Sequence, residues 1–207
     1  FTADAFDLAG TDPTFSTAGV NINFVDGGAT ANLILGNAAD LEINTNLDGN
    51  AAGNISIADN ITIIGINGNA SQDVVLNAGT STGTVTVKAI GTSSAEINDV
   101  TMTGGGGIFL KGDITTSDTG GVTFNSAVEI TTNDVTIDTS AGSGGSVDFN
   151  STINSTTTNQ ALTINSGAGA VAIDGVIGGE ASDHLDGLSI NASSGTGTIA
   201  LAAIGAD

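Results

Sequence analysis

The feature that most constrains this chain is a short triplet, aliphatic-x-aliphatic, that recurs along most of its length. In its first form the triplet is followed by a branched aliphatic residue five or six positions after its start. Copies of this first form begin at Ile55, Val85, Ile108, Val122, Val147, Val171 and Ile199. In its second form the triplet is mostly followed by Asn or Asp, and copies begin at Leu41, Val74, Val100, Val135, Leu162 and Leu188. From Val135 onward the two forms alternate strictly, which indicates a repeat protein.

The spacing of the copies sets the size of the repeat. The first-form starts 122, 147, 171 and 199 differ by 25, 24 and 28, and the second-form starts 135, 162 and 188 differ by 27 and 26. Strict alternation predicts strands with one inward aliphatic face, separated by turns rich in Gly, Asn, Ser and Asp. A unit this small cannot bury that face alone, so it must stack on its neighbours. We therefore predict an all-β fold, a parallel β-helix (β-solenoid) with turns of about 26 residues. An array of β-sandwich repeats is the alternative.

The segment 1–40 follows the repeat less well than the remainder. It holds four of the seven Phe residues and the only proline, and its aliphatic residues show no clear register. We interpret 1–40 as an N-terminal cap or junction with irregular strands, and 41–207 as the β-solenoid repeat segment. The last residues, from Ile199 to Asp207, still follow the repeat, so we expect the array to continue beyond the chain. Phe1 is not an initiator methionine, so we expect a processed product or an excerpt of a longer chain.

Composition narrows the classes of partner. Two Lys or Arg residues against 22 Asp or Glu residues give a formal net charge of −20. Binding to nucleic acid is driven by Lys and Arg side chains that displace the counterions of its phosphates. A chain with so few of these side chains cannot do this, which excludes nucleic acid as a partner. No apolar run approaches the ~18 residues of a membrane helix, so we expect no membrane insertion. Hydrophobic residues reach 39%, too many for a disordered acidic tail, and the absence of Cys removes disulfide and thiolate chemistry.

An Asn or Asp directly after the second-form strands predicts a structural ladder. These residues enter the left-handed conformation readily and hydrogen-bond locally at a bend. Stacked at the same place of successive turns, their amide groups would hydrogen-bond between turns. A simpler interpretation is that Asn is a common turn residue. The residues expected in the ladder are Asn77, Asp138, Asn165 and Asn191.

One candidate Ca²⁺ segment resembles the first half of an EF-hand loop. Asn44, Asn46 and Asp48 supply oxygens at alternate positions before a glycine that permits a sharp bend. The position of the bidentate Glu is occupied by Ile55, so the bidentate ligand is missing. An Asn/Asp/Gly turn explains the segment more simply.

The second candidate segment surrounds His184, the only histidine. A solvated acidic loop is the simpler interpretation of it, and acid/base catalysis has no second base or positive residue nearby in sequence. We expect no cofactor, with low-affinity association of Ca²⁺ at acidic loops as the alternative. The candidate ligands of this segment are Glu180, Asp183 and Asp186.

Several segments resemble the repeats of giant bacterial surface proteins. They are 144–153 (GGSVDFNSTI), 160–165 (QALTIN), 169–179 (GAVAIDGVIGG) and 197–201 (GTIAL). Over roughly residues 40 to 207 the chain is similar to filamentous-haemagglutinin-like and "β-strand repeat" adhesins of Gram-negative and related bacteria. The resemblance implies a right-handed parallel β-helix, an extracellular location and a role in adhesion or surface structure. It offers no catalytic residues to transfer. The first-form starts 85, 108 and 122 differ by only 23 and 14, which departs from a uniform turn.

The expected function is that of a non-enzymatic structural or adhesive segment of an extracellular bacterial surface protein, forming a stiff acidic rod. The alternative is a subunit that assembles with itself into an extracellular filament or sheath. A β-helical polysaccharide-degrading enzyme is a remote alternative, because the chain has no Arg, Tyr or Trp to stabilise charge or hold sugars. Expected partners are the chain itself, a host or neighbouring cell surface, or a matrix polysaccharide.

Overall fold

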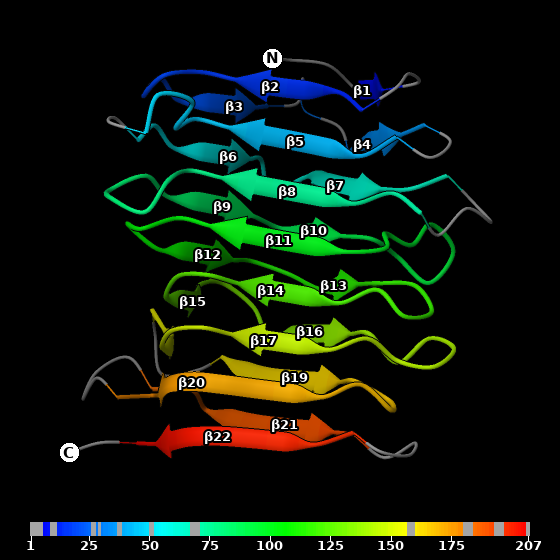
Figure 1. Ribbon diagram of the computed structural model, residues 1–207, viewed down its shortest axis with the longest axis vertical. Helices are drawn as coiled ribbons and strands as arrows, with labels where there is room; N and C mark the ends of the chain where they lie inside the picture. The colour runs from blue at the N-terminus through cyan, green and yellow to red at the C-terminus, as the bar shows by residue number, and fades with distance from the viewer. Residues whose placement is uncertain are drawn as a thin grey trace.

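The computed structural model shows short strands wound into a stack of coils (Figure 1). The structure describes residues 6–8, 12–25, 28, 30–36, 39–49, 52–66, 71–156, 160–179, 184–192 and 197–205. The strands pair in parallel along each face, in about 7 turns of roughly 26 residues. The predicted β-solenoid is therefore confirmed, and the β-sandwich alternative is not the fold. Within these described ranges, no helix has the length and hydropathy to cross a bilayer.

Three stacks of strands, here called faces 1, 2 and 3, enclose the core. Face 1, at the front of Figure 1, consists of β2 (Thr14–Ser16), β5 (Leu41–Asn44), β8 (Val74–Asn77), β11 (Val100–Thr103), β14 (Val122–Phe124), β17 (Val147–Phe149), β20 (Val171–Ile177) and β22 (Ile199–Ile204). Face 2 consists of β3 (Ile22–Phe24), β6 (Ile55–Ile57), β9 (Val85–Val87), β12 (Ile108–Leu110), β15 (Val128–Ile130) and β18 (Ile153–Ser155). Face 3 consists of β1 (Phe6–Leu8), β4 (Ala31–Leu35), β7 (Ile61–Ile64), β10 (Ala89–Ile90), β13 (Ile114–Thr115), β16 (Val135–Asp138), β19 (Ala161–Asn165) and β21 (Gly187–Asn191). The long strand β20 joins faces 1 and 2, because it pairs with both β17 and β18.

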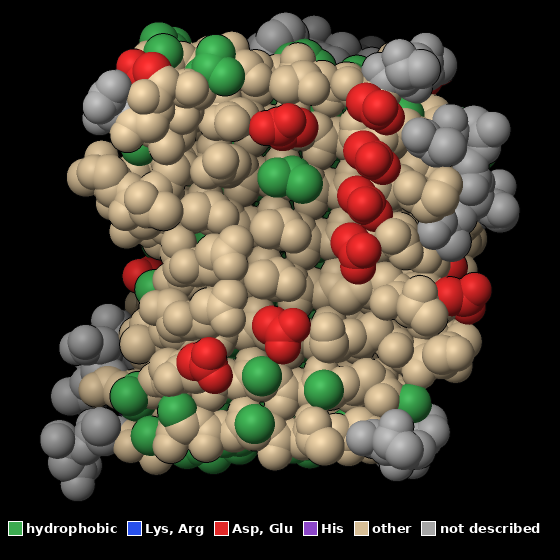
Figure 2. Space-filling model, in the orientation of Figure 1, with side chains coloured by type: hydrophobic (Ala, Val, Ile, Leu, Met, Phe, Trp, Pro, Cys, Tyr) green, Lys and Arg blue, Asp and Glu red, His purple; other side chains and the backbone are tan. Residues whose placement is uncertain are grey.

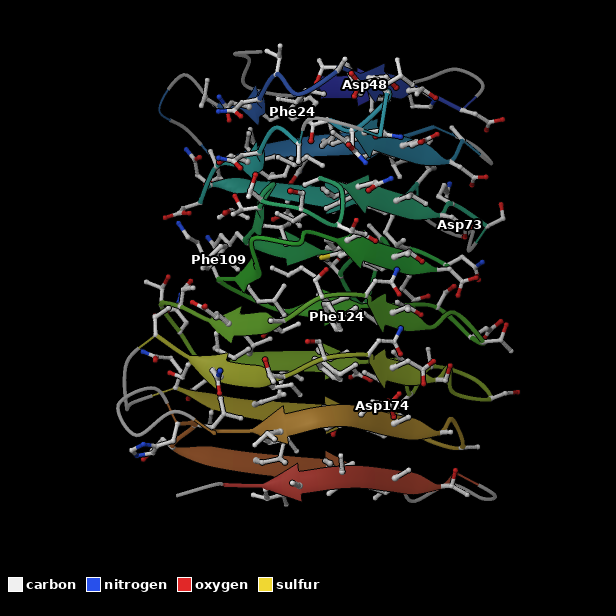
Figure 3. The ribbon with its side chains drawn as sticks, turned by 60° about the vertical axis from the view of Figure 1, so that its left-hand side comes forward. Phe24, Asp48, Asp73, Phe109, Phe124 and Asp174 are labelled. Atoms are coloured by element: carbon white, nitrogen blue, oxygen red, sulfur yellow. The ribbon has the colours of Figure 1, made fainter. Side chains whose placement is uncertain are left out.

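Inward-facing aliphatic side chains form a continuous core along the axis. Buried and half-buried positions alternate in strands of all three faces, as expected when every second side chain points inward. The register stacks like on like, and Val100 pairs with Val74 on one side and Val122 on the other. Phe124 and Phe149 stack with ring centroids 4.6 Å apart, and Figure 3 shows Phe124 between the stacks of strands. Each fully buried large side chain contributes about 1.5–3 kcal/mol to folding.

The two sequence forms do not map onto two faces. The first form lies on face 2 in β6, β9 and β12, but on face 1 in β14, β17, β20 and β22. The second form lies on face 1 in β5, β8 and β11, but on face 3 in β16, β19 and β21. This change of face explains the short interval between Ile108 and Val122, which belong to different stacks. All three faces carry the same aliphatic-x-aliphatic pattern, so the pattern alone cannot distinguish them.

The strands of the segment 1–40 join the same three stacks as the rest of the chain. β1 pairs with β4, β2 with β5 and β3 with β6, all in parallel. Coil length varies along the stack, because the interval from Leu41 to its register partner Val74 is much longer than that from Val100 to Val122. The face 1 strands keep three or four residues at these places. The loops between faces therefore take up the difference.

Candidate functional site

The register places side chains of like chemistry in columns that run along the axis. The residues of the predicted ladder fall in two such columns. Asp138, Asn165 and Asn191 are successive register partners on face 3. Asn77 lies on face 1, where its partner in the preceding coil is Asn44. The structure thus brings three of the four residues together and separates the fourth, because the second form changes face along the chain.

Side chains in these two columns cap local turns. Asp138 Oδ1 accepts a hydrogen bond from the backbone N–H of Ser140 at 2.9 Å. Asn77 Oδ1 accepts one from the backbone N–H of Gly79, also at 2.9 Å. Each bond joins a side chain to the backbone two positions on, which is the local role that Asn and Asp commonly take.

Hydrogen bonds between polar side chains of successive coils, one of them between two amides, form at a place that the sequence did not lead us to select. Asn125 and Asn150 directly follow β14 and β17, in the same column as Asn77 and Thr103. Asn150 Nδ2 donates to Asn125 Oδ1 at 2.9 Å, and Asn125 Nδ2 donates to Thr103 Oγ1 at 3.1 Å. The signal in the sequence was the dipeptide Phe-Asn at the end of two first-form triplets. It was missed because the ladder was sought only after second-form strands.

A column of aspartates runs along the corner where the chain enters face 1. Figure 2 shows them as a row of acidic side chains on the right of the visible surface. Each carboxylate accepts a hydrogen bond from the backbone N–H of the next coil: Asp12 from Asp40 at 3.2 Å, Asp40 from Asp73 at 3.0 Å, Asp73 from Asp99 at 3.1 Å and Asp99 from Gly121 at 2.7 Å. Neighbouring coils are about 4.8 Å apart, so these charges lie close together. The sequence analysis missed the column, although an Asp directly before the triplet marks it.

The same corner is built differently in later coils. The buried hydroxyl of Thr139 donates to the carbonyl of Gly145 at 2.6 Å, and that of Ser166 donates to the carbonyl of Gly169 at 2.9 Å. These glycines are required by close approach of backbone to backbone. A Cβ on Gly145 would lie 2.0 Å from the carbonyl oxygen of Gly120, and a Cβ on Gly169 would lie 2.0 Å from that of Gly145. The hydroxyl and the glycine together tie one side of the corner to the other.

The first Ca²⁺ candidate segment lies in the turn after β5. Asn44 Oδ1 accepts a hydrogen bond from the backbone N–H of Asn46 at 2.9 Å, and Asn44 Nδ2 donates to Glu42 Oε1 at 3.2 Å. The side chain of Asn46 lies against the next coil, because a Cβ on Gly79 would be 2.8 Å from its Cγ. Asp48 is exposed on the same turn. Asn44 and Asn46 thus use their side chains within the turn and against the next coil.

The second candidate segment lies at the other end of the stack. Glu180 and Asp183 fall outside the described residues. Asp186 is exposed directly before β21, and its backbone N–H donates to the carbonyl of Gln160 at 2.8 Å. Among the residues that the structure describes, no group of three or more His, Cys, Asp or Glu side chains is placed to hold a metal ion.

The carboxyl group of Glu96, on the loop after β10, has a raised pKa. Burial raises the pKa of Glu96, and the carboxylates of Asp118 and Asp138 raise it further. These carboxylates belong to the two following coils, at the corner between faces 3 and 1. Ionised Glu96 therefore opposes folding at this corner.

Two surface grooves of similar size lie on the stack. The first, of about 410 Å³, follows the aspartate column on face 1 and is lined by Asp73, Asp99, Thr101 and Thr123. The second, of about 430 Å³, lies on face 3 over β10 and β13. No protein-family model matches this chain, and comparisons with curated proteins and with solved structures gave no match.

Proposed function

We propose that this chain is a non-enzymatic structural and adhesive segment of an extracellular bacterial surface protein, in which it forms part of a stiff acidic rod. The observation that carries the proposal is the axial register, in which the same columns of core and capping side chains pass from coil to coil. Bending such a stack would break ladder hydrogen bonds, core contacts and side-chain caps together. Seven turns rise by about 34 Å, so one chain supplies a short length of rod.

The charge of the surface supports the same role. A formal net charge of −20 keeps neighbouring rods apart and discourages edge-to-edge association. The aspartate column adds to this charge while it also stabilises the backbone. The resemblance of the repeats to bacterial adhesins supports the extracellular location.

Two measurements test this proposal. Antibodies against the purified chain should label intact cells of the bacterium that produces it, and labelling only after permeabilisation would contradict an extracellular role. The folded chain should also survive proteinase K far longer than a Gly145→Ala variant, whose corner is disrupted. Equal cleavage of the two chains would argue against a rigid rod.

Self-assembly into a filament is the second candidate function, and the surface of β22 favours it. The register partners of this strand on β20 are mostly buried, yet its own aliphatic side chains are exposed, because β22 is the last strand of the described stack. The exposed residues are Ile199 at 48%, Leu201 at 38% and Ile204 at 65%. Sedimentation at rising protein concentration, with and without millimolar Ca²⁺, tests this candidate. A constant monomer mass under both conditions would remove this candidate.

A further inference from the structure

Both lysines of the chain lie at the same position of neighbouring coils. Lys88 directly follows β9 and Lys111 directly follows β12, and Val87 pairs with Leu110 in the ladder between these strands. Lys88 and Lys111 are therefore the next register partners. The chain has 22 carboxylates and no other Lys or Arg. Its two lysine side chains thus meet at one corner, between faces 2 and 3.

The two lysines differ in their partners. Lys111 Nζ lies 2.7 Å from Asp59 Oδ1, and this is the one ion pair within the described residues. Asp59 belongs to the coil before that of Lys88, so the pair reaches across the Lys88 coil. In the part of the chain that the structure describes, Lys88 has no such carboxylate partner and stands beside a second ammonium group. Lys88 is therefore the ammonium group of this corner that is left for an anion from outside the described chain.

Both lysines line the groove of about 430 Å³ on face 3. Its volume is in the range of small-molecule sites. Ala89, the register partner of Thr62, contributes only a methyl group, which leaves a depression in the face. The remaining side chains are polar and carry hydroxyl, amide and carboxylate groups: Thr62, Thr92, Thr115, Asn133, Asp113 and Asp134.

The two aspartates of the groove are held in place by the backbone of the next coil. Asp113 Oδ1 accepts a hydrogen bond from the N–H of Thr136 at 2.8 Å, and Asp134 Oδ1 accepts one from the N–H of Ala161 at 2.9 Å. These bonds use one oxygen of each carboxylate. The second oxygen of each is left as an acceptor for a hydroxyl group, in an orientation that is already fixed.

We propose that this groove binds an acidic saccharide, with a uronate carboxylate on Lys88 and sugar hydroxyl groups on Asp113 and Asp134. The inference rests on the proposed adhesive function and names the class of ligand. A uronic acid carries one anion and several hydroxyl groups on one ring, which matches one unpaired ammonium beside two fixed carboxylates. A neutral sugar would leave Lys88 without an anion, and a simple anion would leave the hydroxyl acceptors unused. A polyanion with several charges on each ring would be repelled by the rest of the molecule.

The test uses trigalacturonate as the probe and neutral galactotriose as its uncharged counterpart. In amide NMR spectra of the full chain, trigalacturonate should shift the signals of Gly91 and Gly112, which line the groove. Galactotriose should bind at least tenfold more weakly. Lys88→Gln should reduce trigalacturonate affinity at least tenfold, and Lys88→Arg should retain most of it.

Ser81→Asp is the matched control variant. It changes the net charge by the same amount as Lys88→Gln, on an exposed turn outside the groove, and it should leave affinity within twofold. The proposal is overturned if Gly91 and Gly112 do not shift, or if Lys88→Gln binds as well as the wild type. It is also overturned if Lys88→Gln abolishes a concentration-dependent increase in mass, because the acidic surface of a second copy would then occupy the groove. Protease resistance and cell-surface labelling report on the rod independently, so loss of saccharide binding alone leaves the structural proposal intact.

Discussion

The corner between faces 3 and 1 is built in two ways along the same stack. In the N-terminal coils, the carboxylates of Asp40, Asp73 and Asp99 accept hydrogen bonds from the backbone of the following coil. In the C-terminal coils, buried hydroxyls such as that of Thr139 bond to the carbonyl of a glycine. Both arrangements satisfy backbone groups that would otherwise lack partners at a bend.

Both arrangements accept loops of different length. An aspartate caps only the residue that re-enters face 1, and the loop before it runs over 36–39 in the coil of Asp40 but over 65–72 in the coil of Asp73. At the corner built with glycines, a Cβ added to Gly145 or Gly169 would lie 2.0 Å from a carbonyl oxygen of the preceding coil. The coils from Val122 to Val147 and from Val147 to Val171 have nearly the same length, yet Thr139 bonds six positions ahead and Ser166 only three. The two arrangements therefore differ in how they satisfy the backbone at the bend, and neither requires one loop length.

The largest loss of stability is expected from a substitution at the corner where Gly145 packs against the preceding coil. Gly145→Ala should lower the free energy of unfolding by about 3 kcal/mol, because the new Cβ must displace the carbonyl of Gly120. At Gly187 a Cβ would meet only the Ala161 side chain at 3.7 Å. Gly187→Ala is therefore the control, and it should change stability by no more than about 0.5 kcal/mol. Urea denaturation of both variants measures the difference, and equal losses would show that close backbone approach does not limit this corner.

Loss of the Thr139 hydroxyl at the same corner should cause the next largest loss of stability. Thr139→Val keeps the shape of the side chain but removes the donor to the Gly145 carbonyl, which should cost about 1–2 kcal/mol. Thr163→Val, on the outward side of β19, makes the same change at a half-buried position. Thermal unfolding should show a lower Tm for Thr139→Val alone. A similar Tm for the two variants would mean that the carbonyl is satisfied in another way.

At the corner built with aspartates, loss of a hydrogen-bond acceptor should lower the stability of the fold, whereas loss of the negative charge alone should not. Asp73→Ala removes the cap on Asp99 and should destabilise by about 1 kcal/mol. Asp73→Asn keeps an oxygen in place and removes one of the stacked negative charges, so it should match or exceed the wild type in stability at low salt. Denaturation at low and high NaCl separates the two effects. Equal destabilisation by Ala and Asn would show that the charge itself is required.

The smallest effect concerns Glu96. Its pKa is raised in the folded protein, so the folded state binds the proton more tightly than the unfolded chain does. Ionised Glu96 therefore opposes folding at neutral pH, and this penalty disappears as the pH falls through the raised pKa. Glu96→Gln should raise the Tm slightly at pH 7, with a gain that shrinks on acidification. Asp174→Asn is the control for removing one exposed charge, and a gain for Glu96→Gln that grew on acidification would contradict the assignment.

Sequence reasoning succeeded where information is local. Alternation at Val147 to Phe149 predicts a strand with one buried side, and the structure shows that pattern. The short, regular period of the triplets predicts a stacked coil, because so small a unit cannot bury its own apolar face. The candidate site was less predictable. The aspartate column joins residues 22 to 33 positions apart in sequence, and nothing in one dimension states which of several similar strands lie next to each other.

The sequence by itself therefore determined the class of fold, the length of its repeat and the acidity of its surface, since these follow from alternation, spacing and composition. Only the tertiary structure decided which face each triplet joins, which polar side chains form columns, and that Lys88 and Lys111 share one groove. The physical reason is that three chemically equivalent strands occur in each coil. Loops of unequal length then set the register between coils, and register alone decides which side chains meet.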